Sequence, residues 1–361
     1  MNFNQPGVFI KKFRYEIIAL SLSVYGMYLR FALLARREFW SDEVWSLRVL
    51  QEPFKPFWQR FNYTDFTYFP GEYMINWPFV FLFKSNKWGV SIPHIILTLL
   101  SFYFLYIICK RHLHSVLAWI VTFTLMAVHR DLIFHQLELR AYAVLPLLSL
   151  AAFCFMEEVI SKKYSLTRPR KTLILFAFIF IIIFHIYGAI ILFFTMAYFV
   201  LSESKERTFR DIFMRNSRFL ATIVLIGLPL YLWYSVGSPQ TYKASGYLAY
   251  TFEYIPNPVD NLFGFIKTNL CNLVGNKKLY PLGIFLLVPF ILPLRQRLQQ
   301  IGFLLVLIIL PIMVIFYPNL LMGYHVLQRQ FTWAMPLMAF LIGWCLDGLI
   351  GFIQKTKNDL N

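Results

Sequence analysis

Long apolar runs, separated by short polar segments, recur from one end of the chain to the other. About 20 apolar residues in a helix are enough to cross the hydrocarbon core of a bilayer. Because the runs leave no stretch over for a folded water-soluble unit, the pattern predicts an all-α membrane bundle of about ten spans in one domain, 1–361. The predicted spans are 15–35, 90–109, 114–128, 140–156, 172–184, 187–201, 219–235, 280–294, 301–317 and 331–351.

The continuous apolar stretch 172–201 is long for one span and short for two. At about 1.5 Å per residue it would make roughly 45 Å of helix. Lysines and arginines flank it on both sides, in 162–171 and 205–218, and such basic segments favour the cytoplasmic face. We therefore expect the chain to cross twice here, with His185 and Gly188 at a turn on the far face.

The basic segments predict that both termini are cytoplasmic and that two long loops, 36–89 and 237–279, lie on the outer face. Within the first loop, the apolar segment 74–83 is too short to span and predicts an interfacial or re-entrant helix. Polar side chains from segments far apart in the sequence would then gather at one face. They include Asp42, Glu43, His129, His135, Glu138, Arg140, His185, Tyr187, His325 and Arg329.

The composition agrees with a membrane setting. Hydrophobic residues make up 58% of the 361 residues and charged residues 14%, whereas a soluble domain carries about 25% charged residues. The net charge is +16, from 34 Lys and Arg against 18 Asp and Glu. Basic loops orient spans and meet anionic head groups, so we expect no nucleic-acid partner. Cys109, Cys154 and Cys345 lie in apolar runs and Cys271 in a loop, so no disulfide framework is expected.

An acidic pair, Asp42 and Glu43, follows an aromatic pair just beyond the first predicted span. A carboxylate at the membrane surface can act as a general base in a water-poor cleft, where desolvation favours its protonated form. The alternative is an acidic pair that only offsets the charges of Arg36 and Arg37. The spacing of the residues leaves both interpretations open.

Two arginines, Arg140 and Arg329, stand at the beginning of predicted spans. A guanidinium group there either extends to the head-group region or binds a phosphate in a two-point contact. His185 and Tyr187 interrupt an apolar run, and a polar group at that depth is a functional candidate or a satisfied turn. The histidines lack the i, i+4 spacing of a helical zinc site. We expect no cofactor, and a divalent metal could be held only across loops.

Four of these segments, in this order, resemble those of the GT-C membrane glycosyltransferases. The closest branches are the bacterial protein O-mannosyltransferase-like and lipid A aminoarabinose transferase-like enzymes. The first outer loop departs from these branches, because 68–73 replaces their His-Pro-Pro sequence. This difference leaves the substrate open. The matching segments are Phe39–Glu43, Leu137–Tyr142, His185–Gly188, and Arg329–Phe331 with Pro336.

The resemblance implies a GT-C-like fold and an enzyme, a hexosyl- or pentosyltransferase, in the cytoplasmic (inner) membrane. Such an enzyme moves a sugar from a polyprenyl-phosphate carrier to an acceptor hydroxyl on a cell-envelope glycan, lipid or protein outside the cytoplasm. It implies that Asp42 is the general base in an inverting reaction and that Glu43 orients the acceptor or the sugar. Residues implied in binding the donor phosphate or sugar are Arg140, Arg329, His185, Tyr187, Glu138, His135 and Tyr142.

Two other functions remain open at this point. A transporter or flippase for lipid-linked sugars would place ionisable groups near the bilayer midplane, on paired broken helices. Apart from Arg30 the polar groups cluster at one face, which favours the enzyme. A non-catalytic subunit of a polysaccharide assembly complex would show no dependence on Asp42.

Overall fold

The computed structural model describes 6–51, 70–161, 166–203, 224–229, 272–275, 277–321 and 328–360, together with isolated residues between 211 and 267. Within these ranges the chain is helical and contains no strand, which confirms the predicted all-α class. The α-helices are α1 (Pro6–Arg36), α2 (Ser41–Gln51), α4 (Pro70–Phe83), α5 (Lys87–His112), α6 (Val116–Val128), α7 (Arg130–His135), α8 (Leu145–Ile160), α9 (Arg168–Phe184), α10 (Ile186–Glu203), α13 (Leu294–Gly302), α14 (Leu310–Leu321) and α15 (Ala334–Leu360). Tighter or wider helical segments are η1 (Ala141–Ala143), η3 (Lys277–Ile291), η4 (Phe303–Ile309) and η5 (Gln328–Phe331).

Four continuous segments among the described residues are long and apolar enough to cross a membrane, so the protein is a multi-pass membrane protein. Shorter apolar helices match three further predicted spans. The exact number of spans stays a prediction, because 219–235 lies largely outside the described residues. The long segments are Phe13–Arg36, Lys87–His112, Leu294–Ile315 and Ala334–Asp359, and the short ones are Val116–Val128, Tyr187–Glu203 and Lys278–Ile291.

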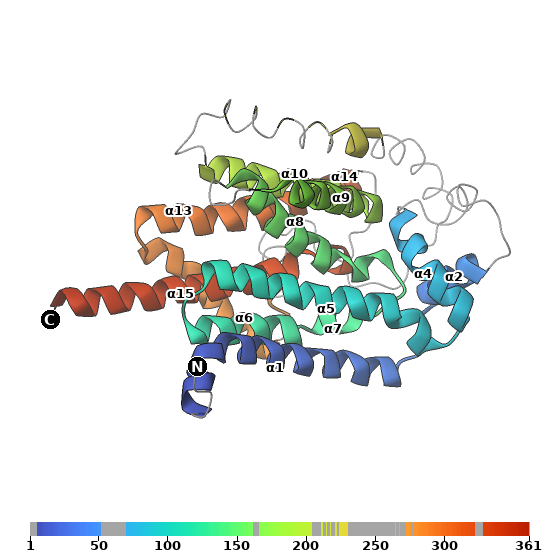
Figure 1. Ribbon diagram of the computed structural model, residues 1–361, viewed down its shortest axis with the longest axis horizontal. Helices are drawn as coiled ribbons and strands as arrows, with labels where there is room; N and C mark the ends of the chain where they lie inside the picture. The colour runs from blue at the N-terminus through green and yellow to red at the C-terminus, as the bar shows by residue number, and fades with distance from the viewer. Residues whose placement is uncertain are drawn as a thin grey trace.

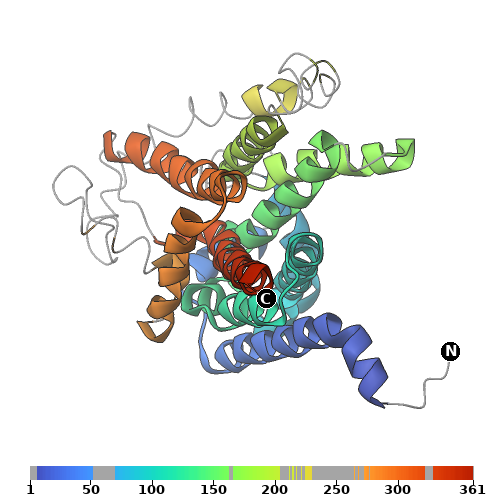
Figure 2. The ribbon, with the colours of Figure 1, turned by 90° about the vertical axis from the view of Figure 1, so that its left-hand side faces the viewer.

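The long helices run lengthwise through the bundle (Figures 1 and 2). Helix α6 packs against both α1 and α15, and α8 packs against both α5 and α10. Helices α2 and α4 stand together at one end, where α1 finishes and α5 begins, while the C-terminus lies at the other end (Figure 1). We call these the α2–α4 end and the opposite end.

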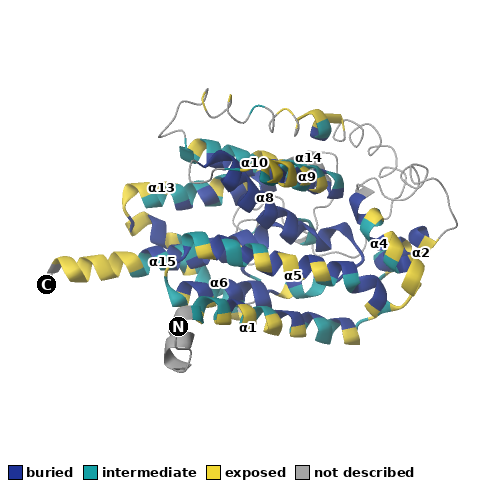
Figure 3. Cartoon of the chain, viewed as in Figure 1, coloured by how far each residue is buried: buried dark blue, intermediate teal, exposed yellow. Residues whose placement is uncertain are grey.

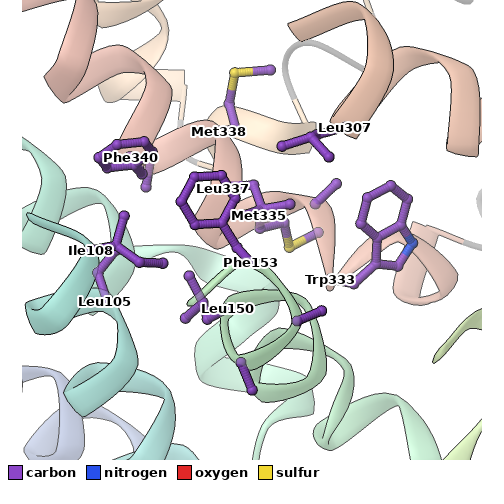
Figure 4. Close-up of a cluster of buried hydrophobic side chains, with 14 of the residues drawn as sticks. Leu105, Ile108, Leu150, Phe153, Leu307, Trp333, Met335, Leu337, Met338 and Phe340 are labelled. Carbon is purple, nitrogen blue, oxygen red and sulfur yellow. The ribbon is translucent and has the colours of Figure 1, made fainter. Parts of the chain in front are cut away.

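The interior of the bundle is filled by large apolar side chains where α5, α8, η4 and α15 meet (Figure 4). The ring of Phe153 lies 5.6 Å from that of Phe303 and 6.1 Å from that of Phe340, centroid to centroid. Apolar side chains also cover the outside: Leu20 is 67% exposed and Phe176 64%, and exposed positions line the outer face of α1 and α5 (Figure 3). Lipid rather than water is the solvent that suits such a surface.

The long apolar stretch 172–201 breaks where the sequence predicts. Helix α9 ends at Phe184 and α10 begins at Ile186, with the intervening His185 in an extended conformation. Gly188 lies so close to the preceding helix that a Cβ atom there would be 2.0 Å from the carbonyl oxygen of Ile181. Only glycine fits this approach. The break places an imidazole ring inside a bundle that is otherwise apolar at this position.

Candidate functional site

The acidic pair opens helix α2, where free backbone N–H groups favour negative charge. Glu43 is 1% exposed, and its carboxylate accepts hydrogen bonds from the N–H groups of Trp40 (3.2 Å) and Leu139 (2.9 Å). Arg37 adds a two-point contact at 2.6 and 3.0 Å. Glu43 therefore fastens the start of α2 to the end of α1 and to the segment before Arg140.

Asp42 lies between two arginines that the sequence separates widely. Its Oδ2 atom is 2.9 Å from Nη2 of Arg329 and 3.5 Å from Nη2 of Arg140. Arg140 also donates from Nη1 to the Asp42 carbonyl (3.4 Å) and to the Ser46 hydroxyl (3.3 Å). We call Asp42, Arg140 and Arg329 the Asp42–arginine centre. Its two guanidinium groups both face the same carboxylate oxygen.

Two segments from distant parts of the chain hold the arginines in place. Arg140 precedes η1 in extended backbone, with φ −150° and ψ 149°. Arg329 belongs to η5, and its guanidinium carbon lies 5.3 Å from the centre of the Tyr142 ring, within the range of a cation–π contact. The hydroxyl of Thr332 donates to the Tyr142 carbonyl at 3.1 Å and so ties η5 to η1. Tyr142, which follows Arg140 by two residues, therefore contacts Arg329 through its ring and brings the two arginine segments together.

A third arginine, Arg30 of α1, supports the segment that leads to Arg140. It is fully buried, and its Nε and Nη2 atoms donate to Oε1 of Gln136 at 2.8 and 2.6 Å. It also donates to the carbonyl groups of Gly26, Met126 and Ala127. These hydrogen bonds, together with the Phe102 ring 5.4 Å from its guanidinium carbon, allow the buried cation to be tolerated. Arg30 fixes Gln136, four residues before Arg140.

His185 and Tyr187 lie beside the ring of Tyr142. The His185 ring is 5.8 Å from Tyr142 and 4.4 Å from Tyr187, centroid to centroid. Nδ1 of His185 accepts the Tyr187 backbone N–H at 3.0 Å, and burial lowers the pKa of His185 to about 3. The neutral ring therefore carries its proton on Nε2. That Nε2 atom is buried and has no hydrogen-bond partner, so it can donate to a ligand.

His135 and Glu138 bind each other rather than the Asp42–arginine centre. Nδ1 of His135 lies 2.9 Å from Oε2 of Glu138, and the two residues are 9% and 2% exposed. They bracket the turn between α7 and the Arg140 segment, and the Glu138 N–H donates to the His135 carbonyl at 3.2 Å. The pair shapes this turn.

A polar cluster between α4 and α5 was missed by the sequence analysis. Glu72, Asn76 and His94 are at most 4% exposed. Asn76 donates to Oε1 of Glu72 at 3.0 Å, and Nε2 of His94 is 3.9 Å from the same atom. Burial raises the pKa of Glu72 to about 8, although the charge of Arg140 lowers it. The i, i+4 spacing of two polar residues in an apolar helix was the signal for this cluster.

Some predicted features lie outside the described residues. They are His325, Cys271, the part 52–69 of the predicted loop 36–89, and most of the predicted loop 237–279. Within the described part of the chain, no three His, Cys, Asp or Glu side chains come together so as to hold a metal ion.

One solved structure has a similar fold. It is the crystal structure of ArnT from Cupriavidus metallidurans bound to undecaprenyl phosphate, with a TM-score of 0.56 and 13% sequence identity. The superposition covers 93% of this chain and 60% of the ArnT chain. The likeness shows that the chain has an ArnT-like fold, in agreement with the predicted membrane helical bundle. No protein-family model matches the chain, and no curated protein has a similar sequence.

Proposed function

We propose that this protein is a GT-C-type membrane glycosyltransferase, which moves a sugar from a polyprenyl-phosphate carrier to an acceptor hydroxyl. The observation that carries the proposal is the Asp42–arginine centre, in which one carboxylate lies beside two guanidinium groups on an ArnT-like fold. The crystallised ArnT holds undecaprenyl phosphate, a ligand of the same chemical class as the proposed donor. A phosphate ester is an anion of the kind that guanidinium groups bind in a two-point contact.

In the proposed reaction, Asp42 takes the proton of the acceptor hydroxyl. The acceptor oxygen attacks the anomeric carbon from the side opposite the phosphate, and the bond from that carbon to the phosphate oxygen breaks. Polyprenyl phosphate leaves with the electron pair, and the anomeric centre is inverted. Arg140 and Arg329 stabilise the charge that develops on the leaving phosphate, as fixed cations do in a water-poor site.

The remaining residues take supporting roles in this proposal. The Nε2–H of His185 donates to the phosphate or the sugar, with Tyr142 and Tyr187 as the walls around it. Glu43 is a positioning residue, because Arg37 and two backbone N–H groups occupy its carboxylate. It orients the acceptor or sugar only indirectly, through α2.

We place the α2–α4 end outside the cytoplasmic membrane and propose a cell-envelope glycan, lipid or protein as the acceptor. The support is the basic segment around Arg168, Arg170 and Lys171, which begins α9 at the opposite end. Single cysteines beside Asp42, His185 and Arg329 should react with a membrane-impermeant thiol reagent added outside. Labelling of these positions only from the cytoplasmic side would reverse the orientation.

The structure also bears on the two other functions. A transporter would use a charge near the midplane, but Arg30 donates to fixed carbonyl groups and to Gln136, which explains this charge as structural support. A non-catalytic subunit would not need a carboxylate at position 42. The Asp42 substitution therefore separates the enzyme from both rivals.

The test compares Asp42→Asn with Asp347→Asn. Asp347 accepts the backbone N–H groups of His114 and Ser115 at the opposite end, so it reports the general effect of the same chemical change. Purified proteins in lipid nanodiscs receive undecaprenyl-phosphate-linked hexoses and pentoses, with envelope membranes as the source of acceptor. General-base catalysis contributes about 10²–10⁴-fold, so Asp42→Asn should lose that much turnover. Turnover equal to that of Asp347→Asn would remove Asp42 as the base.

A further inference from the structure

Three polar side chains at the interface of α4 and α5 have more hydrogen-bonding capacity than the bundle uses. They are Glu72 and Asn76 of α4 and His94 of α5, and we call them the Glu72 subsite. We infer that the Glu72 subsite recognises hydroxyl groups of the sugar on the polyprenyl-phosphate donor. This inference rests on the proposed function and deepens it, because it adds the part of the site that selects the sugar.

The first argument is the hydrogen bonds that these side chains leave unmade. Oε2 of Glu72, Oδ1 of Asn76 and both ring nitrogens of His94 are buried without a hydrogen-bond partner among the described residues. Within the subsite, Nδ2 of Asn76 donates to Oε1 of Glu72 at 3.0 Å. Nε2 of His94 is 3.9 Å from the same oxygen, too far for a hydrogen bond. Buried polar groups are normally paired, so these open positions together indicate a polar ligand.

The open positions suit hydroxyl groups. Burial raises the pKa of Glu72 to about 8, so at neutral pH its carboxyl group is largely protonated and can donate as well as accept. The carbonyl oxygen of Asn76 accepts, and the imidazole ring of His94 carries at least one N–H. A sugar hydroxyl also both donates and accepts, so it matches this set of groups.

The second argument is the position of the subsite beside the Asp42–arginine centre. Helix α4 packs against α2, the helix that carries Asp42. Glu72 is close enough to Arg140 for the charge of Arg140 to act on its pKa. The subsite therefore adjoins an arginine that we assign to the donor phosphate. A small apolar cluster holds these segments together, and it consists of Leu47, Leu50, Val80, Val90 and Leu139.

The start of α4 also touches the break between α9 and α10. A Cβ atom on Gly71 would lie 2.9 Å from Cα of Phe184 and 3.1 Å from the carbonyl oxygen of Ile183. Only glycine allows this approach, and it places Glu72, the next residue, beside the segment that carries His185. We have assigned the Nε2–H of His185 to the phosphate or the sugar. A sugar held between the two arginines and this N–H therefore presents its hydroxyl groups to the Glu72 subsite.

Helix α4 is an element that can yield to a ligand. It has 14 residues and packs against the bundle by the face that carries Glu72 and Asn76. Its outer face is exposed at Met74, Trp77 and Phe81. Pro78 lies inside the helix and has no N–H group, so one backbone hydrogen bond of the helix is missing. An outward movement of this short helix opens the buried polar atoms to a hydroxyl group.

The experiment compares two ligands on each purified protein in lipid nanodiscs. One ligand is undecaprenyl phosphate, and the other is the undecaprenyl-phosphate-linked hexose or pentose that the wild type binds most tightly. The measurements are made at about pH 6, below the pKa of Glu72, so that neutral substitutions change no charge. Glu72→Leu and Asn76→Leu should each weaken binding of the sugar-linked lipid about tenfold, the effect of about one lost hydrogen bond. Binding of the lipid phosphate without sugar should stay near the wild-type value and thus reports a folded phosphate site.

Two further variants separate hydrogen bonding from packing and charge. Glu72→Gln keeps a donor and an acceptor, so it should bind the sugar-linked lipid more tightly than Glu72→Leu. Ser101→Ala is the matched control, because it removes a buried hydroxyl of α5 that donates to the Leu97 carbonyl within the helix. It should bind both lipids like the wild type. Equal loss in Glu72→Gln and Glu72→Leu would indicate a charged ligand or a packing role, and would overturn the inference.

The two ligands also separate failure of the inference from failure of the proposed function. If the leucine variants lost affinity for both lipids equally, or for neither, the inference would be wrong and the proposed function would stand. A wild-type protein that bound neither lipid would reject the proposed function, and the inference with it.

Discussion

Two groups of charged residues stand at the two ends of the bundle, and they differ in how far their carboxylates are buried. At the opposite end, Arg111 of α5 binds Glu157 and Glu158 of α8 at 2.9 and 2.6 Å, and Arg170 of α9 binds Glu158 at 2.9 Å. We call these four residues the Arg111 network. Two guanidinium groups meet two carboxylates there, and Nε2 of His112 lies 3.2 Å from Oε1 of Glu157.

The Asp42–arginine centre at the α2–α4 end has two guanidinium groups and one carboxylate. Burying a charge without a partner costs free energy. In the Arg111 network both carboxylates are almost fully buried, at 5% and 7% exposed, and the network joins three helices. In the Asp42–arginine centre the carboxylate of Asp42 is 27% exposed and contacts two arginines through one oxygen. The difference teaches that the cluster with the more exposed carboxylate is the better candidate for meeting a ligand.

The largest expected effect is on stability, at the Arg111 network. Arg111→Gln leaves Glu157 without its arginine and Glu158 with one arginine instead of two. Breaking a buried ion pair costs about 3–5 kcal/mol, so the unfolding temperature should fall sharply. Turnover per folded molecule should stay near the wild-type value. Arg170→Gln is the control, and its effect should be smaller because Arg170 is 39% exposed.

The next effect is on donor use, at the Asp42–arginine centre. Arg140→Lys and Arg329→Lys keep the charge but lose the planar two-point contact. Each should weaken donor use by about 1–3 kcal/mol, as measured by kcat/KM with a polyprenyl-phosphate sugar. Arg170→Lys at the opposite end serves as the matched control. If both lysine variants had the wild-type kcat/KM, the two arginine side chains would only extend to the head groups.

A pH effect sharpens the comparison through Glu72. The folded state raises the pKa of Glu72 from 4.5 to about 8, so between these values the folded protein keeps a proton that the unfolded chain loses. The stability of the wild type should therefore fall, relative to Glu72→Gln, as the pH rises from about 4.5 to about 8, and then level off. Thermal unfolding of both proteins over this range measures the difference.

The same titration should change ligand binding. Glu72 is close enough to Arg140 for the charge of Arg140 to act on its pKa. Above about pH 8 the ionised Glu72 adds a negative charge near Arg140, so undecaprenyl phosphate should bind more weakly. Glu72→Gln should not show this loss. An identical pH profile in the two proteins would remove Glu72 from the surroundings of the phosphate site.

The smallest effect is expected at an exposed ion pair. Lys110 lies 3.7 Å from Glu16, and their side chains are 62% and 40% exposed. Such pairs contribute about 0–1 kcal/mol. Lys110→Ala should therefore change the unfolding temperature little and leave turnover unchanged. A large loss of stability would show that exposure of an ion pair does not predict how much it contributes to the stability of this bundle.

The sequence by itself determined the fold class, because only a few kinds of backbone structure can cross a bilayer. Backbone groups in hydrocarbon must bond within the chain, so apolar runs such as 90–109 become helices. The interruption at His185 was also visible, because a polar residue is conspicuous in an apolar run. Ordered motifs likewise picked out Asp42, Arg140 and Arg329, which the structure places in contact.

Only the tertiary structure decided which charges meet. Glu43 and Asp42 are neighbours in the sequence, yet one is enclosed by Arg37 and backbone N–H groups and the other faces two arginines. Arg30 looked like a charge at midplane depth and proved to be a support for Gln136. The partners of a polar side chain depend on which helix faces pack together, and that packing is not encoded in the spacing of residues along one chain segment.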